Sequence, residues 1–293
     1  MNNEPVVSVL VTVYNRAQYL RACLESILAS TMRDFEVVIV DDLSSDGSVE
    51  IAEEFASRHA CVRFIRNETN LGDYPNRMKA ASLARGRYLK YVDSDDLIYP
   101  HTLAVMSEAL NANADANLAL SHPLPEADQP YPWKLSSHDA WSKEFIGTGC
   151  MGSGPTGAII RCSAFVESGG FRNWGVLSDT DLWYRLSARA PIMLLPPGLV
   201  WWRRHSDQEF TKNRAELVYL ERGFELVMAT LASPESPLSK AETRQAIGRA
   251  RQHHARRLLS LGLKRRMPLE AIRLIRRSGL STAEMVRGLA AYR

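Results

Sequence analysis

Residues 6–13 read VVSVLVTV, and residues 36–40 read EVVIV. Both runs are rich in Val and Ile, as is typical of parallel strands that are buried on both faces. Through the first hundred residues, such short apolar runs alternate with amphipathic stretches that are long enough for crossover helices. This alternation predicts the order β-α-β-α-β-α-β-α, and therefore an α/β fold with a mostly parallel, doubly wound sheet.

The composition excludes several other classes of protein. The chain has 293 residues, of which 45% are hydrophobic and 24% charged, without the bias of a disordered, collagen-like or coiled-coil chain. Residues 1–5 lack the basic start of a signal peptide, and the apolar run at 6–13 is too short to span a membrane. We therefore expect a cytoplasmic protein. The four cysteines form neither a C-x-x-C pair nor a zinc-site spacing, so we expect reduced thiols.

Polar segments follow the predicted strands, at 12–15, 41–42, 70–73 and 93–96, and three of the four are acidic. In an open parallel sheet, ligands bind beyond the carboxyl ends of the strands. Carboxylates gathered there repel one another unless a cation or hydrogen-bond donors offset the charge, so the cluster predicts a site for a hard divalent metal. The alternative is that each Asp caps a helix N-terminus by accepting backbone N–H bonds.

Four segments together resemble the GT-A-fold family 2 glycosyltransferases: VSVLVTVYNR at 7–16, VIVDDLSSDGS at 38–48, NLG at 70–72 and DSDD at 93–96. Farther on, GGF at 169–171, SDTDLW at 178–183 and RRHSDQ at 203–208 are similar to the family's base-bearing segment and closing loop. The resemblance implies an inverting, metal-dependent transfer of a sugar from a nucleotide-diphosphate donor, with UDP favoured. The implied acceptor is a hydroxyl of a cell-envelope polysaccharide or lipid-linked oligosaccharide.

The resemblance also implies the contacts to the nucleotide. Asp42 matches the position that hydrogen-bonds the nucleobase, and Thr12 and Tyr14 match positions that flank it. An aromatic face beside a carboxylate suits a stacked pyrimidine that presents an N–H, which favours uracil. Arg77 matches a basic donor-contacting position, although Met78 replaces the Asn that usually follows it.

The DSDD segment matches the metal-binding D-x-D element of the family. Asp95 corresponds to the ligand of Mn²⁺ or Mg²⁺, with Asp96 as a helper, whereas Asp93 and Ser94 lie nearer the sugar and ribose. The ion stabilises the charge on the leaving nucleotide. His205 matches a position near the metal or the diphosphate, and its alternative is a surface histidine.

Asp179 matches the general base, which takes the proton from the acceptor hydroxyl as that oxygen attacks the face opposite the diphosphate. The alternative is an N-cap of a helix at 182–188. Ser178 stands where the family often has Glu, so the resemblance does not imply an acceptor contact by this side chain. We expect Trp174 near the site and Trp183 in the core, because 169–176 reads as a loop.

The segment GTGCMG at 147–152 satisfies the dinucleotide fingerprint G-x-G-x-x-G. It lacks a preceding strand and an acidic residue about twenty positions later, so we interpret it as a loop before a strand at 158–161. Two other functions remain as alternatives. A catalytically silent sugar-nucleotide-binding protein would keep Asp42 and Asp95 without turnover. A sugar-1-phosphate nucleotidyltransferase needs a Gly-rich loop after the first strand, where this chain has Tyr14-Asn15-Arg16-Ala17.

The C-terminal region is strongly basic. Residues 212–293 carry 17 Lys and Arg against seven Glu and no Asp, within predicted amphipathic helices. Such helices can lie on anionic lipid at the inner face of the membrane, and the alternative is a bundle packed on the catalytic domain or on a second subunit. No nucleic-acid-binding motif is present. We therefore expect a nucleotide-sugar-binding half at 1–115, an acceptor and catalytic-base half at 116–211, and a basic helical extension at 212–293.

Overall fold

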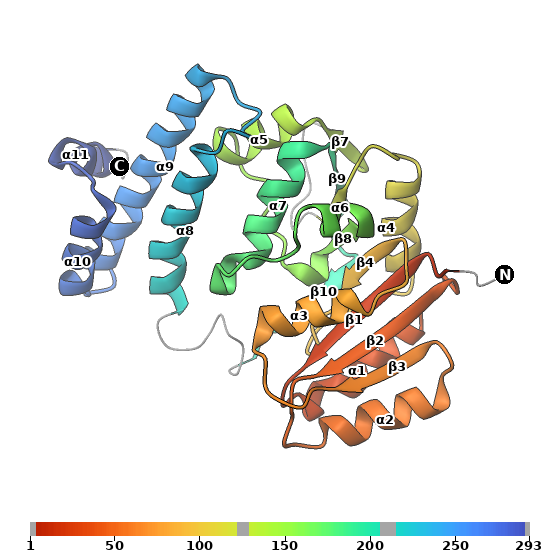
Figure 1. The fold of residues 1–293 in the computed structure, drawn as a ribbon. Helices are drawn as coiled ribbons and strands as arrows, with labels where there is room; N and C mark the ends of the chain where they lie inside the picture. The colour runs from red at the N-terminus through yellow and green to blue at the C-terminus, as the bar shows by residue number, and fades with distance from the viewer. Residues whose placement is uncertain (1–3, 122–128, 206–214, 291–293) are drawn as a thin grey trace. The chain divides into compact units, whose positions relative to one another are not determined.

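The computed structural model describes residues 4–121, 129–205 and 215–290, and the chain forms two compact units (Figure 1). The first unit comprises residues 1–140 and 150–204, and the second comprises 141–149 and 205–293. The first unit holds the sheet, and the second is helical. The domain boundaries expected at 115/116 and 211/212 stay predictions.

An eight-stranded sheet in the order β3-β2-β1-β4-β8-β6-β9-β7 forms the first unit. Its strands are β1 (Val7–Val13), β2 (Phe35–Asp41), β3 (Val62–Arg66), β4 (Tyr88–Tyr91), β6 (Leu118–Ser121), β7 (Trp133–Leu135), β8 (Ala158–Arg161) and β9 (Ile192–Leu195). The first four are parallel, β6 and β9 are parallel, and β8 and β7 run antiparallel to their neighbours. The predicted α/β fold with a mostly parallel, doubly wound sheet is confirmed.

Helices cover both faces of the parallel half of the sheet. They are α1 (Ala17–Leu28), α2 (Ser48–Arg58), α3 (Asp73–Ser82) and α4 (Thr102–Asn111). Alternate valines of β1, from Val7 to Val13, pack with α1, α2 and α4 in one apolar cluster, whereas α3 lies on the opposite face (Figure 1). Since both faces are buried, β1 and β2 are apolar at nearly every position, which explains the continuous runs in the sequence.

The remaining elements of the first unit complete the sheet edge and its surroundings. They are β5 (Leu97–Ile98), paired with β10 (Val200–Trp201), η1 (Pro155–Gly157), α6 (Cys162–Glu167), η2 (Gly175–Leu177) and α7 (Ser178–Arg189), and α5 (Ser137–Phe145) runs into the second unit. Helix α5, not a strand, precedes the GTGCMG segment, so this segment is not a dinucleotide fingerprint. Trp183 is fully buried and its indole N–H donates to the Ser153 carbonyl at 2.8 Å, which confirms its prediction as a core residue.

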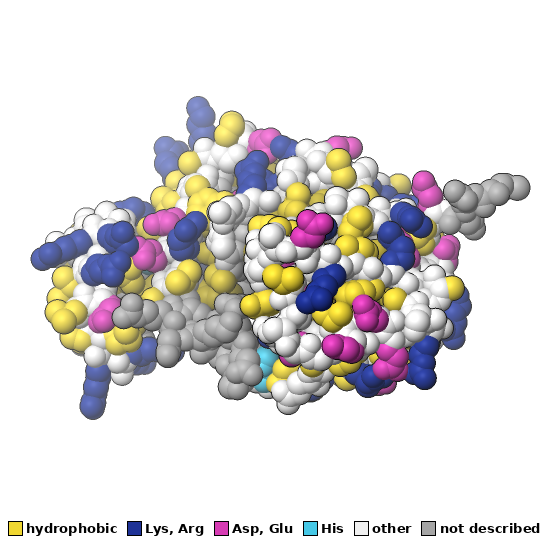
Figure 2. All heavy atoms as spheres, turned by 60° about the horizontal axis from the view of Figure 1, so that its bottom comes forward, with side chains coloured by type: hydrophobic (Ala, Val, Ile, Leu, Met, Phe, Trp, Pro, Cys, Tyr) yellow, Lys and Arg dark blue, Asp and Glu magenta, His cyan; other side chains and the backbone are white. Residues whose placement is uncertain are grey.

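The second unit contains α8 (Ala215–Leu231), α9 (Lys240–Leu263), α10 (Pro268–Ser278) and α11 (Thr282–Ala290). A capping box of Ser239 and Glu242 starts α9, and Gly279, at φ 61°, ends α10 in the left-handed conformation. Lys and Arg side chains stand among hydrophobic ones on the surface of these helices (Figure 2). None of the helices in the described residues has the length and apolar character needed to cross a membrane.

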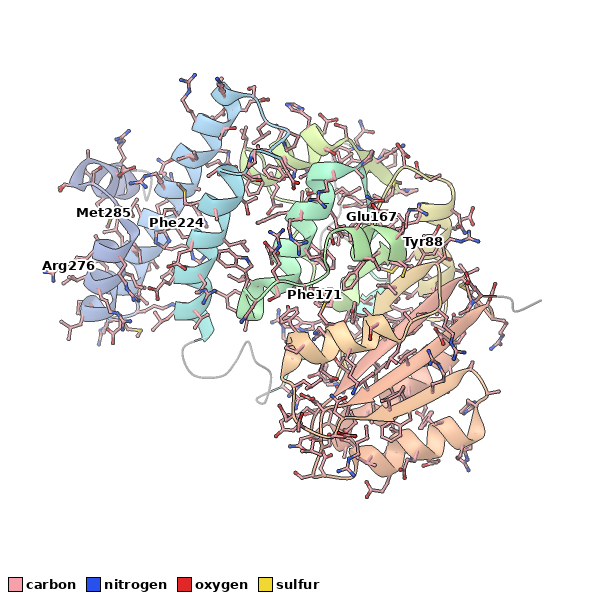
Figure 3. All side chains as sticks on the ribbon, in the orientation of Figure 1. Tyr88, Glu167, Phe171, Phe224, Arg276 and Met285 are labelled. Atoms are coloured by element: carbon pink, nitrogen blue, oxygen red, sulfur yellow. The ribbon has the colours of Figure 1, made fainter. Side chains whose placement is uncertain are left out.

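The core of the second unit is small. It is built around Leu220, Leu258, Leu261, Ala271 and Leu274. Beside it, the ring of Phe224 stacks on that of buried His254 with centroids 4.1 Å apart (Figure 3). Burial, with nearby arginines, lowers the pKa of His254 to about 4, so its imidazole is neutral and packs as part of the core.

Candidate functional site

The loops that follow β1, β2, β3 and β4 meet at the carboxyl edge of the sheet. The loop after β1 contacts that after β2, because Asn15 N donates to Ser44 Oγ at 2.9 Å and the Asn15 side chain accepts from Ser45 N at 2.8 Å. It also reaches the loop after β4, where Arg16 Nε lies 3.3 Å from an Asp95 carboxylate oxygen. The edge that parallel topology predicts as a ligand site is therefore assembled from segments of four separate strands.

Asp42 anchors the loop that follows β3. Its buried carboxylate accepts at Oδ1 from Leu71 N (2.8 Å) and Asn67 Nδ2 (2.7 Å), and at Oδ2 from Gly72 N (2.8 Å). Gly72 has a φ of 85°, which favours glycine at this position. A carboxylate oxygen accepts about two hydrogen bonds, so Oδ2 retains capacity for one more donor. The sequence predicted a nucleobase contact for Asp42 but did not reveal these hydrogen bonds to the loop after β3.

Tyr14 and Thr12 lie where the prediction placed nucleobase contacts. Tyr14 is 51% exposed in the loop after β1, and Thr12 is half-buried at the end of the strand. Asn15 follows with a φ of 52°, in the left-handed region that Asn tolerates better than most residues. An exposed aromatic ring on a loop fixed at both sides is a suitable stacking surface, and its use by a nucleobase stays a prediction.

The turn at 93–96 holds three carboxylates in different environments. Asp93 accepts from Arg77 Nη1 at 2.7 Å, and its side chain is 27% exposed. Asp95 is 13% exposed beside Arg16, and Asp96 is buried and accepts from Arg203 N at 3.1 Å. Burial and the neighbouring Asp93 carboxylate raise the pKa of Asp96. Asp93 and Asp95 are therefore the carboxylates that a ligand can reach.

The donor set at this turn fits a divalent cation that arrives with a diphosphate. Within the described residues, no group of three or more His, Cys, Asp or Glu side chains could hold a metal by itself. Mg²⁺-like ions commonly bind one or two carboxylates and complete their coordination with substrate phosphates and water. Asp95 and Asp93 supply such oxygens. His205 belongs to the second unit, so its role as a metal ligand stays a prediction, and Ser206–Gln208 of the same segment lie outside the described residues.

Arg77 on α3 forms ion pairs with two carboxylates, those of Asp73 and Asp93. Its Nε lies 2.8 Å from Asp73 and its Nη1 2.7 Å from Asp93, and its guanidinium faces the rings of Tyr74 and Tyr91. Burial alone would lower the pKa of Arg77, but the two carboxylates outweigh it and raise that pKa. Arg77 therefore remains charged and positions Asp93, and its predicted contact to the donor stays a prediction.

Asp179 lies in the first turn of α7, which begins at Ser178 with Leu177 as its N-cap. The N-cap alternative for Asp179 is therefore wrong. Its Oδ1 accepts from Thr180 N at 2.6 Å. Burial raises the pKa of Asp179 to about 6, although the Thr180 hydrogen bonds and the charge of Arg77 lower it. Asp179 is thus electrostatically coupled to Arg77, and through it to the turn at 93–96.

Lys90 is not among the residues predicted for the site, and it is fully buried in β4, next to the acidic turn. Its ammonium donates to the Thr156 carbonyl, and the Thr156 hydroxyl accepts from Asp93 N at 3.0 Å. Burial lowers the pKa of Lys90 to about 7, while Asp93 and Asp96 raise it. Lys90 and η1 therefore support the backbone of the turn from beneath. The sequence signal that could have indicated this role is a lysine within the short strand YLKY, whose other residues are apolar or aromatic.

Phe171 joins the base-bearing half of the unit to α3 and β4 (Figure 3). Its ring packs edge-on against Tyr74 at 5.0 Å and Tyr91 at 5.4 Å between centroids. Phe171 N donates to Met78 Sδ at 3.2 Å, so the side chain that replaces the usual Asn contacts the GGF turn. Trp174 is half-buried, and its predicted place near the acceptor stays a prediction.

Buried Arg185 fixes the same turn from α7. It pairs with Asp181 at 2.8 Å and donates to the carbonyls of Ser168 and Gly170 at 2.7 and 2.6 Å. Gly170 has a φ of 64°, which a residue with a side chain rarely adopts. Arg185 therefore links the GGF turn to Asp181, which lies in the first turn of α7 two residues after Asp179.

Comparison with known proteins identifies the family and the fold type of the chain. The family described as "Glycosyl transferase family 2" matches residues 8–166. The uncharacterized glycosyltransferase MJ1057 of Methanocaldococcus jannaschii is 36% identical over 121 residues, which are 41% of this chain and 42% of that protein. The chain thus spans less than half the length of this relative.

Two solved structures share the fold. TarS 1–349 of S. aureus, in complex with UDP-GlcNAc, has a TM-score of 0.70 at 20% identity over 92% of this chain and 79% of its own. The mannosyltransferase PcManGT of Pyrobaculum calidifontis, in complex with GDP-Man and Mn²⁺, has a TM-score of 0.67 at 15% identity over 99% and 81%. The fold is thus of the GT-A type found in these glycosyltransferases.

Proposed function

The chain belongs to glycosyl transferase family 2, and we propose that it transfers a sugar from a nucleotide-diphosphate donor, most readily a UDP-sugar, to a hydroxyl acceptor with inversion at the anomeric carbon. The observation that carries the proposal is the convergence of Tyr14, Asp42, Asp93 and Asp95 at the carboxyl ends of the parallel strands β1 to β4. The complexes of TarS with UDP-GlcNAc and of PcManGT with GDP-Man and Mn²⁺ support a nucleotide-sugar donor and a divalent metal.

In this proposal the nucleobase stacks on Tyr14 beside Thr12. The remaining acceptor capacity of Asp42 Oδ2 takes an N–H of the base, as the imide of uracil offers. Because both oxygens of Asp42 already bind the loop after β3, binding of the base requires no reorganisation of that carboxylate.

Asp95 would hold Mn²⁺ or Mg²⁺ together with the diphosphate of the donor, and the proposed metal role of His205 rests on the sequence resemblance alone. When bound, the ion neutralises the charge that develops on the leaving nucleotide. Arg16, 3.3 Å from Asp95, supplies a fixed positive charge at the same edge. Asp93 and Ser94 contact the ribose and sugar, with Asp93 oriented by Arg77.

Asp179 takes the proton from the acceptor hydroxyl as its oxygen attacks the anomeric carbon. A pKa of about 6 leaves Asp179 ionised at neutral pH, and makes it a stronger base than an ordinary aspartate. Arg185 and the GGF turn restrict its helix, so the base is positioned before the acceptor binds.

We propose that the acceptor is a growing polysaccharide or lipid-linked oligosaccharide of the cell envelope, and that the protein works in the cytoplasm with residues 212–293 at the inner face of the membrane. A second copy of the chain is the other partner that this region could bind. The alternative of a silent sugar-nucleotide-binding protein predicts donor binding without release of UDP from a UDP-sugar.

Isothermal titration calorimetry with UDP, GDP, CDP and dTDP, each with and without Mn²⁺, tests the donor site. We expect UDP to bind best, and Mn²⁺ to tighten that binding. Asp95→Ala should abolish the effect of Mn²⁺. Asp34→Ala is the matched control, because Asp34 is exposed just before β2, at the opposite edge of the sheet. Equal enhancement by Mn²⁺ in wild type and Asp95→Ala would contradict the metal role of Asp95.

A further inference from the structure

We propose that the corner between α9 and α10, residues 263–276, is a docking surface for an anionic lipid bilayer. This inference rests on the proposed function, which puts residues 212–293 at the inner face of the membrane, and deepens it by naming the surface that docks and the lipid that it meets. The surface lies entirely within the second unit.

Three large aliphatic side chains of this corner face solvent. Leu263, the last residue of α9, is 71% exposed, and Leu269 and Ile272 on α10 are 77% and 49% exposed. Leu269 and Ile272 are three positions apart, so they are neighbours on one helix face. Single exposed leucines are ordinary, but three within ten residues form a patch that would gain by leaving water.

The packing of α10 explains why these side chains cannot turn inward. Ala271 and Leu274 face the core of the unit and are buried, which directs Leu269 and Ile272 to the opposite side. A Cβ placed on Gly262 would lie 3.3 Å from the Cβ of Ala271, so the end of α9 packs closely on α10. The apolar patch is therefore a fixed feature of the corner.

The charges around the patch identify its partner. Residues 263–276 contain five cationic side chains and one carboxylate, Glu270. Arg266, Arg273 and Arg276 are exposed, and Arg273 and Arg276 share the outer face of α10 with the patch. Figure 2 shows such a mixture of Lys, Arg and hydrophobic side chains on these helices. Two copies joined through this face would bring like charges together, whereas an anionic bilayer accepts the cations at its headgroups and the leucines below them.

Co-sedimentation of the full chain with vesicles tests the surface. The vesicles are phosphatidylcholine alone, or phosphatidylcholine with phosphatidylglycerol, at low and high salt. We expect binding to the anionic vesicles only, weakened by salt. Because no donor is present, the result does not depend on the transfer reaction, which is followed separately by UDP release in solution.

Two double variants separate the charge from the apolar contribution. Arg273→Gln with Arg276→Gln should lower the partition coefficient about thirtyfold, since each cation near an anionic surface contributes roughly a fivefold factor. Leu269→Gln with Ile272→Gln should lower it by about tenfold or more. All four side chains are exposed, so circular dichroism and UDP release should match wild type.

Lys240→Gln with Arg244→Gln is the matched control, which also removes two exposed cations from α9. Arg244 lies about 30 Å from Lys264 along the helix, several Debye lengths away at physiological salt. Equal loss of binding in this control, or equal binding to neutral vesicles, overturns the proposal. A self-associating chain that becomes monomeric with Leu269→Gln and Ile272→Gln, and binds no vesicle, shows instead that a second copy covers the corner.

Discussion

Replacement of Asp179 by Asn tests the base and its environment together. The amide has nearly the same shape as the carboxylate and can still accept from Thr180 N, but it cannot take a proton from the acceptor. We expect turnover to fall by about a hundredfold or more, the usual contribution of a general base, with nucleotide affinity unchanged.

The same substitution should stabilise the protein. Burial raises the pKa of Asp179 from 3.8 to about 6, so the folded chain binds this proton more tightly than the unfolded chain does. Ionisation of Asp179 therefore lowers the free energy of unfolding. The full cost applies above about pH 6, where Asp179 is ionised in both states, and it vanishes below about pH 4, where Asp179 is protonated in both states. At about 1.4 kcal/mol per pKa unit, the cost is about 2 to 3 kcal/mol at pH 8, and Asp179→Asn removes it.

Thermal melts of wild type and Asp179→Asn from pH 4 to pH 8 measure this difference, and initial rates over the same range measure the role in catalysis. The wild-type rate should fall as the pH drops through about 6, to roughly one-tenth of its plateau one unit lower, because Asp179 becomes protonated. Asp139→Asn is the control, since a hydrogen bond from Ser136 lowers the pKa of exposed Asp139, and this variant should not be stabilised.

Two results would refute the reasoning. A variant that retains full turnover would remove Asp179 from the reaction. A gain in melting temperature that is absent at pH 8, or that persists unchanged at pH 4, would show that Asp179 is not held in the buried environment from which its raised pKa follows.

Two further substitutions probe the neighbourhood of the site. Arg185→Met should lower stability by about 3 to 5 kcal/mol, because Asp181 would remain buried without its cation, and a fall in melting temperature of about ten degrees would show it. Arg16→Gln should tighten Mn²⁺ binding to the UDP-bound protein by about fivefold, the worth of a partly exposed ion pair, since Arg16 no longer competes for Asp95. Electron paramagnetic resonance of free Mn²⁺ measures this, and unchanged affinity would contradict the competition.

The order and type of the elements around the parallel sheet could be predicted from the sequence. Strands β1 and β2 are buried on both faces, so their sequences are nearly continuous runs of Val and Ile. Such runs can be recognised without knowing which distant residues pack against them. Parallel topology then places the segments after Val13, Asp41 and Tyr91 at a single edge, because the crossover helices return each strand in the same direction. For this reason the motifs alone located Asp42 and the turn at 93–96.

The partners of those residues depend on the tertiary structure. Lys90 donates to Thr156, 66 positions away, and Asp42 receives its bonds from a loop about 30 positions away. Burial of Asp179, which raises its pKa, comes from packing of α7 in the folded unit. Leu269 is likewise exposed because the opposite face of α10, with Ala271 and Leu274, packs in the core. Local sequence determines backbone preference and hydrophobic period, whereas desolvation and the pairing of charges depend on groups that only the folded chain brings together.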